Sequence, residues 1–307
     1  MTKRPINYIF IEGPDLAGKS TLYNDIHSSS DYRWNIQDRS ALSMLIHAKQ
    51  YGRNTFQHVE QLRSEIFNLN NVIIILLPDW SVISRRFTER GDAIQNLSSL
   101  KKVYDLFSDA SEELKEYPNV IVLRDEVDRQ TVRYLTNILK NYENATTECI
   151  KDNVLQACVS RDSGECVGLN FTLFDDGTFD DIDEADLLYD KEVEYYNEIL
   201  EKVKEKIKLE FEGKNEYNLP QDKNSRRFIY TSDTCISLAH FLLRDESLDC
   251  KYFIRSSNVK DTLYYDLNFL KFLSSSVFNA LKASGKFCRM TFVINSGHVL
   301  DIINNEP

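Results

Sequence analysis

The residues best placed to do chemistry lie in a short glycine-rich stretch near the start of the chain. Residues 13–20 read Gly-Pro-Asp-Leu-Ala-Gly-Lys-Ser and follow the pattern G-x-x-x-x-G-K-[ST], directly after the apolar run 8–11. A strand that leads through such a turn into a helix points several backbone N–H groups at one spot, where phosphate groups bind. In this pattern the lysine reaches the β- and γ-phosphates, and the hydroxyl that follows it holds Mg²⁺. The stretch therefore predicts a site for a nucleoside triphosphate, with ATP and Mg²⁺ as the expected ligands. The residues expected to form it are Gly13, Gly18, Lys19, Ser20 and Thr21, with Ser20 on the metal.

Two further polar clusters fit a phosphotransferase. Asp38 and Arg39 come at the end of a short predicted strand, 34–37, at the carboxyl edge where open α/β sheets bind ligands. Arg86 and Arg90 lie in a predicted helix, one turn apart. Phosphoryl transfer depends on positive charge around the moving phosphoryl group more than on covalent chemistry. Arginines on a helix beside a triphosphate site are therefore expected to supply that charge.

The elements that must position these side chains alternate between strand and helix. The runs 72–77 and 120–123 are apolar throughout, as expected for parallel strands covered on both faces. Helices are predicted to begin at Lys19, Ser40, Trp80 and Asp128. This βαβ rhythm predicts an α/β domain with a parallel sheet flanked by helices.

The pattern changes after the polar segment 141–152, which predicts a boundary between domains 1–143 and 144–307. Helices are expected over 185–211 and 266–282, and strands over 228–231, 252–255 and 289–294. The acidic run 175–186 reads as a solvated loop and not as a metal site. An α+β second domain is therefore expected.

The bulk composition narrows the class of protein. The chain has 307 residues, of which 42% are hydrophobic and 28% charged, with a net charge of −11 that falls almost entirely on the second half. An acidic chain is a poor match for tight nucleic-acid binding, so DNA is a disfavoured partner. No apolar run approaches the roughly 18 residues of a membrane span, and no signal peptide is read at the start. The six cysteines include no C-x-x-C pair, so reduced thiols and a cytoplasmic location are expected.

Three motifs in the first half of the chain resemble those of a known family. Residues 12–21 look like the P-loop of thymidylate kinases and related viral deoxynucleotide kinases, over a similarity that spans about residues 6–140. Residues 38–40 match the D-R-[YS] motif of these enzymes, and residues 86–92 match their R-x-x-x-R-G-D lid segment. The resemblance implies that Asp15 contacts the acceptor sugar, that Arg39 holds the acceptor phosphate, and that Arg86 and Arg90 contact the transferring phosphoryl group. A similar compact viral kinase type phosphorylates 5-hydroxymethyluracil within DNA, which leaves the acceptor open.

The second half carries a weaker set of candidates. Arg226 and Arg227 precede a predicted strand, and Arg255 and Ser256 end another, so both pairs suit a phosphate group. Cys235 lies between them in the sequence, and a thiol near several arginines has a lowered pKa and becomes nucleophilic. A lone cysteine or histidine is more often a packed side chain than a catalytic one.

The order of these residues resembles that of thymidylate synthases and the related deoxycytidylate hydroxymethylases, over about residues 190–302. The resemblance implies that Cys235 attacks C6 of a pyrimidine. It implies that the 5′-phosphate is held by Arg226, Arg227, Arg255 and Ser256, with the pair of residues 226 and 227 donated across a homodimer interface. It also implies that His298 lies near the sugar 3′-hydroxyl and that Asp266 reads the exocyclic amine of the base.

Several departures from that family argue against folate-dependent chemistry. Ile236 follows the cysteine where a histidine is usual, and Asn258 and Leu300 stand where the family has Asp and Tyr. No tryptophan follows Trp80, so the residue that stacks on folate is missing. The second domain is therefore expected to bind a pyrimidine nucleotide without turning it over, or to hold a dimer together.

The sequence as a whole favours a kinase that phosphorylates a deoxynucleoside monophosphate, most simply a pyrimidine. Two alternatives remain open. One is a bifunctional enzyme that also modifies C5 of the base with a folate co-substrate, and the other is a kinase that acts on a modified base in DNA.

Overall fold

The computed structural model describes residues 2–90, 96–144, 146–161, 163–179, 182, 193–208, 228–244, 247–281 and 287–299. The chain forms two compact units. One unit comprises residues 6–143, and the other joins residues 1–5 to residues 144–307. Among the described residues, no helix combines the length and the apolar character needed to cross a membrane.

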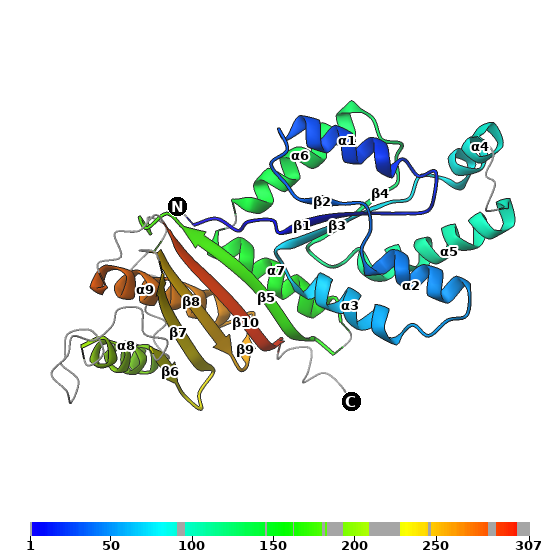
Figure 1. The fold of residues 1–307 in the computed structure, drawn as a ribbon. Coiled ribbons are helices and arrows are strands. Elements are labelled where there is room, and N and C mark those ends of the chain that lie inside the picture. Colours follow the sequence, from blue (N-terminus) through cyan, green and yellow to red (C-terminus); the bar gives the residue numbers. More distant parts are fainter. Residues whose placement is uncertain are drawn as a thin grey trace. The chain divides into compact units, whose positions relative to one another are not determined.

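The unit of residues 6–143 is built on a four-stranded sheet in the order β2-β1-β3-β4. All three strand pairs are parallel, as the βαβ pattern predicts. Helices α1 and α6 lie over one face of this sheet, and α2, α3 and α5 lie over the other (Figure 1). The strands are β1 (Tyr8–Glu12), β2 (Ile36–Gln37), β3 (Asn71–Leu76) and β4 (Val120–Leu123). The helices are α1 (Lys19–Ser29), α2 (Ala41–Gln50), α3 (Phe56–Phe67), α4 (Trp80–Arg90), α5 (Leu97–Leu114) and α6 (Arg129–Glu143).

The apolar core between β1 and helices α1 and α6 fixes the position of α1 on the sheet. Ile9 and Ile11 alternate toward one face of the sheet and are fully buried against Leu22 and Ile26 of α1. The same cluster takes in Leu135 and further apolar side chains of α6. Burial of about 25 cal/mol per Å² of apolar surface holds α1 over the end of β1, so the turn between them has a fixed path.

The other unit contains a six-stranded mixed sheet in the order β5-β10-β8-β7-β6, with β9 paired to β10. Strand β10 runs antiparallel to β5 and parallel to β8. The strands are β5 (Glu165–Asp175), β6 (Ile229–Thr231), β7 (Ile236–Arg244), β8 (Ser247–Ile254), β9 (Ser257–Asn258) and β10 (Cys288–His298). The helices are α7 (Thr147–Val159), α8 (Val193–Ile207) and α9 (Leu263–Ala280).

The predicted elements of this half agree with the structure in part. The strand expected at 252–255 is the end of the longer β8, and helix α9 lies close to its predicted range. Of the helix expected at 185–211, the described part is α8; residues 185–192 and 209–211 lie outside the described residues. The sequence did not predict strands β5 and β7 or helix α7. Both of these strands alternate buried and half-buried side chains, and polar residues interrupt their apolar positions.

The first residues of the chain pair with the unit that contains β5. The backbone groups of Lys3 and Phe174 exchange two hydrogen bonds of 2.7 Å. The Thr2 hydroxyl donates to the Asp175 carboxylate at 2.9 Å, and buried Arg4 donates to Asn153 of α7 at 2.7 Å. Lys3 therefore forms an isolated antiparallel bridge with Phe174 on the outer edge of β5.

Candidate functional site

The glycine-rich turn of residues 13–18 joins β1 to α1, and two of its glycines have backbone conformations that other residues rarely adopt. Gly13 has a φ of +140°, and a Cβ atom there would lie 2.2 Å from the carbonyl oxygen of Leu76 in β3. Gly18 has a φ of +105° and is the N-cap of α1. A side chain at Gly13 would push the loop off the sheet, so this glycine lets the turn cross the end of β3 and open toward the helix N-terminus.

Lys19 is the first residue of α1, and its ammonium group lies inside the turn. It is 9% exposed and donates hydrogen bonds to the carbonyl oxygens of Gly13 at 2.7 Å and Pro14 at 2.9 Å. Burial is the main cause that lowers the pKa of Lys19, while the Asp15 carboxylate, 3.8 Å away, acts to raise it. A buried cation held by two neutral carbonyls can transfer its hydrogen bonds to a phosphate oxygen without moving far.

A second wall beside the turn is formed by Asp15 and the segment that follows β2. Arg39 lies with its guanidinium 3.6 Å from the Asp15 carboxylate, and both side chains are about half exposed. Asp38 and Arg39 follow the end of β2, at the carboxyl edge of the sheet. The predicted placement of this pair beside the turn is therefore present in the structure.

A third wall comes from α4. The Arg86 guanidinium donates to the carbonyl oxygen of Leu16 in the turn at 2.8 Å and to the Glu126 carboxylate at 2.7 Å. Arg85 lies 3.5 Å from the same carboxylate. Glu126 thus orients Arg86 toward the turn, and Arg90, one helical turn further on, is exposed on the same side. Leu16 itself has a positive φ of 67°.

One carboxylate that the sequence analysis did not single out ties the turn to Arg39. Glu12, the last residue of β1, is fully buried. It accepts hydrogen bonds from the backbone N–H of Ser40 at 2.5 Å and of Ser43 at 3.2 Å. It also accepts from the hydroxyl of Ser40 at 2.7 Å and from that of Ser43. Glu12 therefore neutralises the N-terminus of α2 and fixes the residue that follows Arg39. A glutamate directly before the first glycine was the available signal, but nothing local indicated its partners.

These side chains surround a single cleft of about 310 Å³. Its donors fit a polyphosphate: the N-terminus of α1, the buried ammonium of Lys19 and three guanidinium groups converge on it.

Within the described residues no cluster of three His, Cys, Asp or Glu side chains could hold a metal by itself, so any Mg²⁺ here would rely on the Ser20 hydroxyl and on phosphate oxygens. Residues 91–95, which include the Gly91-Asp92 end of the predicted lid motif, lie outside the described residues. The lining residues are Asp15, Leu16, Gly18, Lys19, Ser20, Thr21, Asp38, Arg39, Arg86 and Arg90.

In the other unit the structure brings Cys235 beside Arg255. The Arg255 N–H donates to the Cys235 carbonyl oxygen at 2.8 Å, where β7 begins and β8 has just ended. Both residues are exposed. This bond joins the two backbones, and the predicted proximity of the thiol to the guanidinium group stays a prediction. Arg226 and Arg227 lie outside the described residues, so the rest of the predicted phosphate site is not described.

Two adjacent tyrosines of α8 extend this region, and the sequence analysis missed both. The Tyr195 hydroxyl accepts hydrogen bonds from the Thr234 hydroxyl at 3.1 Å and from the Ile236 N–H at 2.9 Å, on either side of Cys235. Burial raises the pKa of Tyr195 to about 12, so this hydroxyl stays protonated. The Tyr196 hydroxyl donates to Asp266 at 2.9 Å.

Asp266 and His298 occupy different surroundings. Asp266 is 4% exposed, and its second oxygen accepts from the Ser257 hydroxyl at 3.3 Å. His298 ends β10, where it pairs with Asn258 of β9, and it is half-buried. Ser256, directly before β9, connects Arg255 to this strand. Cys235, Arg255, Ser256 and His298 therefore lie at one end of the sheet, where β7 begins and β8 and β10 end.

Two of the solved structures to which the chain is similar are described here. No family model and no curated protein sequence matches the chain. The YorR protein of Bacillus subtilis, solved in complex with phosphorylated GDP, is similar over 44% of this chain and 94% of its own, at 17% identity and a TM-score of 0.34. Thymidylate synthase from T4 phage is similar over 36% of this chain, at 19% identity and a TM-score of 0.24. The chain spans 40% of that synthase. A thymidylate synthase is one of the two resemblances predicted from the sequence.

Proposed function

We propose that the unit of residues 6–143 transfers the γ-phosphoryl group of ATP to a deoxynucleoside monophosphate, with a pyrimidine as the expected base. The observation that carries the proposal is the convergence of Lys19, Arg39 and Arg86 on one cleft at the N-terminus of α1. Such an arrangement binds two sets of phosphates, one from each substrate, and surrounds the group that moves between them.

Each cleft residue has a part in this reaction. Lys19 stabilises charge on the triphosphate, and Arg86 and Arg90 stabilise the transferring phosphoryl group. Arg39 binds the acceptor phosphate, and Asp15 orients the acceptor sugar. Mg²⁺, which the Ser20 hydroxyl would help to hold, neutralises phosphate charge when it is bound. Phosphoryl transfer needs no strong base, so Asp15 acts as an orienting group.

The test is conversion of ATP to ADP in the presence of Mg²⁺ and a panel of acceptors. The panel holds the common deoxynucleoside monophosphates, 5-hydroxymethyl-dCMP, 5-hydroxymethyl-dUMP and DNA that contains hydroxymethyluracil, with products identified by mass. We expect a deoxynucleoside diphosphate from one or two pyrimidine monophosphates. Lys19→Met should lower turnover at least 100-fold, while Lys49→Gln, at an exposed position on α2, should leave it unchanged. Phosphate on DNA alone, or no product at all, would contradict the proposal.

A second activity is suggested by the positions of Cys235 and Arg255 in the other unit, whose backbone groups share a hydrogen bond of 2.8 Å. In that case the chain would also modify C5 of a pyrimidine nucleotide, with Cys235 as the nucleophile at C6 and a folate as the one-carbon donor. Release of tritium from [5-³H]dCMP or [5-³H]dUMP with methylenetetrahydrofolate tests it, and Cys235→Ser should abolish the release. If no tritium is released, the role of this unit is to bind a nucleotide or to hold a homodimer together.

A further inference from the structure

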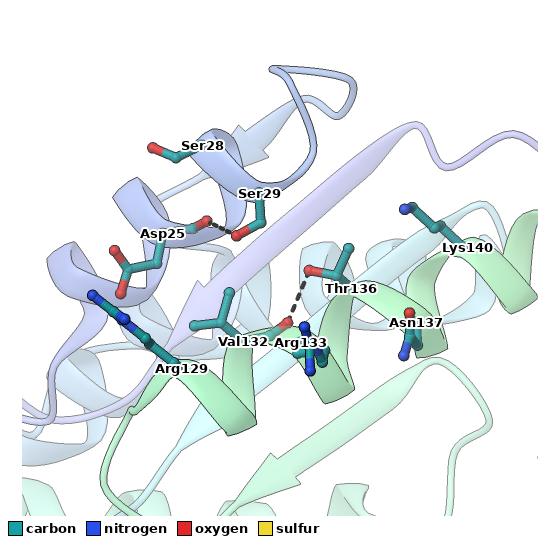
Figure 2. Close-up of a pocket in the computed structure, with 9 residues that line it drawn as sticks. All are labelled: Asp25, Ser28, Ser29, Arg129, Val132, Arg133, Thr136, Asn137 and Lys140. Carbon is teal, nitrogen blue, oxygen red and sulfur yellow. Dashed lines mark hydrogen bonds between the residues drawn. The ribbon is translucent and has the colours of Figure 1, made fainter.

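A second cavity in the unit of residues 6–143 lies between α1 and α6 and shares no residue with the cleft described above. It is an open groove of about 540 Å³. Figure 2 shows the two helices as its walls, with side chains from both directed into it. The lining residues are Asp25, Ser28, Ser29, Arg129, Val132, Arg133, Thr136, Asn137 and Lys140.

The α6 wall is cationic. Arg129, Arg133 and Lys140 fall at intervals of four and seven residues, so they occupy one face of the helix. At a rise of 1.5 Å per residue they spread over about 16 Å along its axis. In the described part of the chain, none of the three has a hydrogen bond or an ion pair with a carboxylate. The α6 wall, with three exposed cations, can therefore bind more than one anionic group.

The α1 wall offers acceptors. The Ser28 hydroxyl donates its proton to the Asn24 carbonyl oxygen at 2.9 Å, and the Ser29 hydroxyl donates to the Asp25 carbonyl oxygen at 2.6 Å. With their protons engaged, these hydroxyl oxygens can accept hydrogen bonds from a ligand. The Asp25 carboxylate is an acceptor as well. This wall therefore suits hydroxyl or amino groups.

We propose that the groove between α1 and α6 is a second nucleotide-binding site, in which phosphate groups bind the α6 wall and sugar hydroxyl or base amino groups bind the α1 wall. The two arginines can each bind a phosphate in bidentate fashion. The volume falls within the range of about 300–1,000 Å³ typical of small-molecule sites. None of the described residues that line the groove is aromatic, so these residues offer no stacking surface of the kind on which single-stranded nucleic acids bind.

The first test is a calorimetric titration with dCTP at a low and stated salt concentration. The protein carries Lys19→Met, so that the P-loop cleft contributes little. We expect one remaining site, and Arg129→Gln together with Arg133→Gln should weaken it at least tenfold. The matched control, Lys49→Gln together with Arg53→Gln, removes two exposed cations elsewhere on the same unit and should change the dissociation constant less than twofold. No remaining site, or a site that both double variants affect equally, would overturn the proposal.

The second test separates a nucleotide from a bare polyanion. Asp25→Ala removes an acceptor and a negative charge from the α1 wall. It should weaken dCTP binding several-fold and tighten binding of inorganic tripolyphosphate, because only dCTP has groups that donate to Asp25. If the two ligands respond alike, the site is a general anion site and the proposal fails. Tighter binding of a twenty-residue oligodeoxythymidylate than of dCTP, lost in the same arginine double variant, would assign the groove to nucleic acid and would also overturn it.

Discussion

The hydroxyl of Ser40 donates a 2.7 Å hydrogen bond to the carboxylate of Glu12, 28 residues earlier in the chain and fully buried at the end of β1. This bond joins the two segments that carry the ATP side and the acceptor side of the proposed site. Glu12 directly precedes the glycine-rich turn, and Ser40 directly follows Arg39. The distance between the two substrates would therefore depend on a contact that neither substrate makes.

Replacement of the Glu12 carboxylate should lower the free energy of unfolding and, as a distinct effect, weaken binding of the acceptor. In Glu12→Gln the amide group turns at least one donor toward the four donors of Ser40 and Ser43, which costs about 2–3 kcal/mol of unfolding free energy. The shift of Arg39 should raise KM for the acceptor monophosphate more than KM for ATP. Urea denaturation and steady-state kinetics check the two effects. Equal changes in both KM values would show that Glu12 acts through stability alone.

The glycine at the start of the turn gives a second prediction, with a built-in control. Gly13→Ala places a Cβ atom against the Leu76 carbonyl oxygen at a φ of +140°, and we expect a loss of about 3 kcal/mol or more together with loss of ATP binding. Gly52, after α2, also has a positive φ, of 62°, but no atom lies within 4 Å of a Cβ built there. Gly52→Ala should cost about 1 kcal/mol and leave binding intact. A Gly13→Ala protein that binds ATP normally would contradict the described path of the turn.

The buried lysine predicts the pH dependence of stability. Burial lowers the pKa of Lys19 from its ordinary value of 10.5, so between the lowered pKa and 10.5 the unfolded chain binds more protons than the folded one. The unfolding free energy of the wild type should therefore rise with pH in that window, relative to Lys19→Met, by at most about 1.4 kcal/mol per pH unit. Denaturation midpoints at several pH values from 7 to 10 measure the difference. A difference that falls with pH would mean that the Asp15 carboxylate outweighs burial.

The thiols should react in two classes. Cys149 and Cys235 are exposed, whereas the other four cysteines are buried. Burial raises the pKa of Cys158 to about 12, and the hydrogen bond with Cys250, together with burial, raises that of Cys288. Titration with a disulfide reagent should therefore modify two thiols rapidly in the native protein and all six after denaturation. Cys149→Ser and Cys235→Ser should each remove one rapid equivalent. Faster reaction of Cys235 than of Cys149 would support a lowered pKa for the proposed nucleophile.

The sequence of residues 6–143 predicts its structure better than the sequence of the other unit does, for a physical reason. In residues 6–143 the strands are continuous apolar runs, and the turn that follows β1 has a spacing tied to one conformation, so the parallel sheet and this turn were predictable. Helices α3 and α5 were not predicted. Glu12 was not predicted either, because its partners lie about 30 residues away. Strand β5 was missed because Gly168 and Asn170 interrupt its apolar positions, and its pairing partner β10 lies more than 100 residues further on. Tyr195 was missed for the same reason, since only the fold places α8 against the Cys235 loop.

The pairing of residues 2–5 with β5 has a consequence for the order in which the chain matures. Thr2 contacts Asp175, which is synthesised 173 residues later, so residues 2–5 wait while the whole of the 6–143 unit leaves the ribosome. Residues 6–143 are thus inserted into the sequence of the other unit, which contains both the residues before the insertion and those after it. A truncated chain that begins at residue 144 would leave the backbone groups of Phe174 unpaired at the outer edge of β5, and such an edge is a template for intermolecular strand pairing. Permuted chains that attach residues 2–5 before residue 144 through a short linker would keep that edge covered.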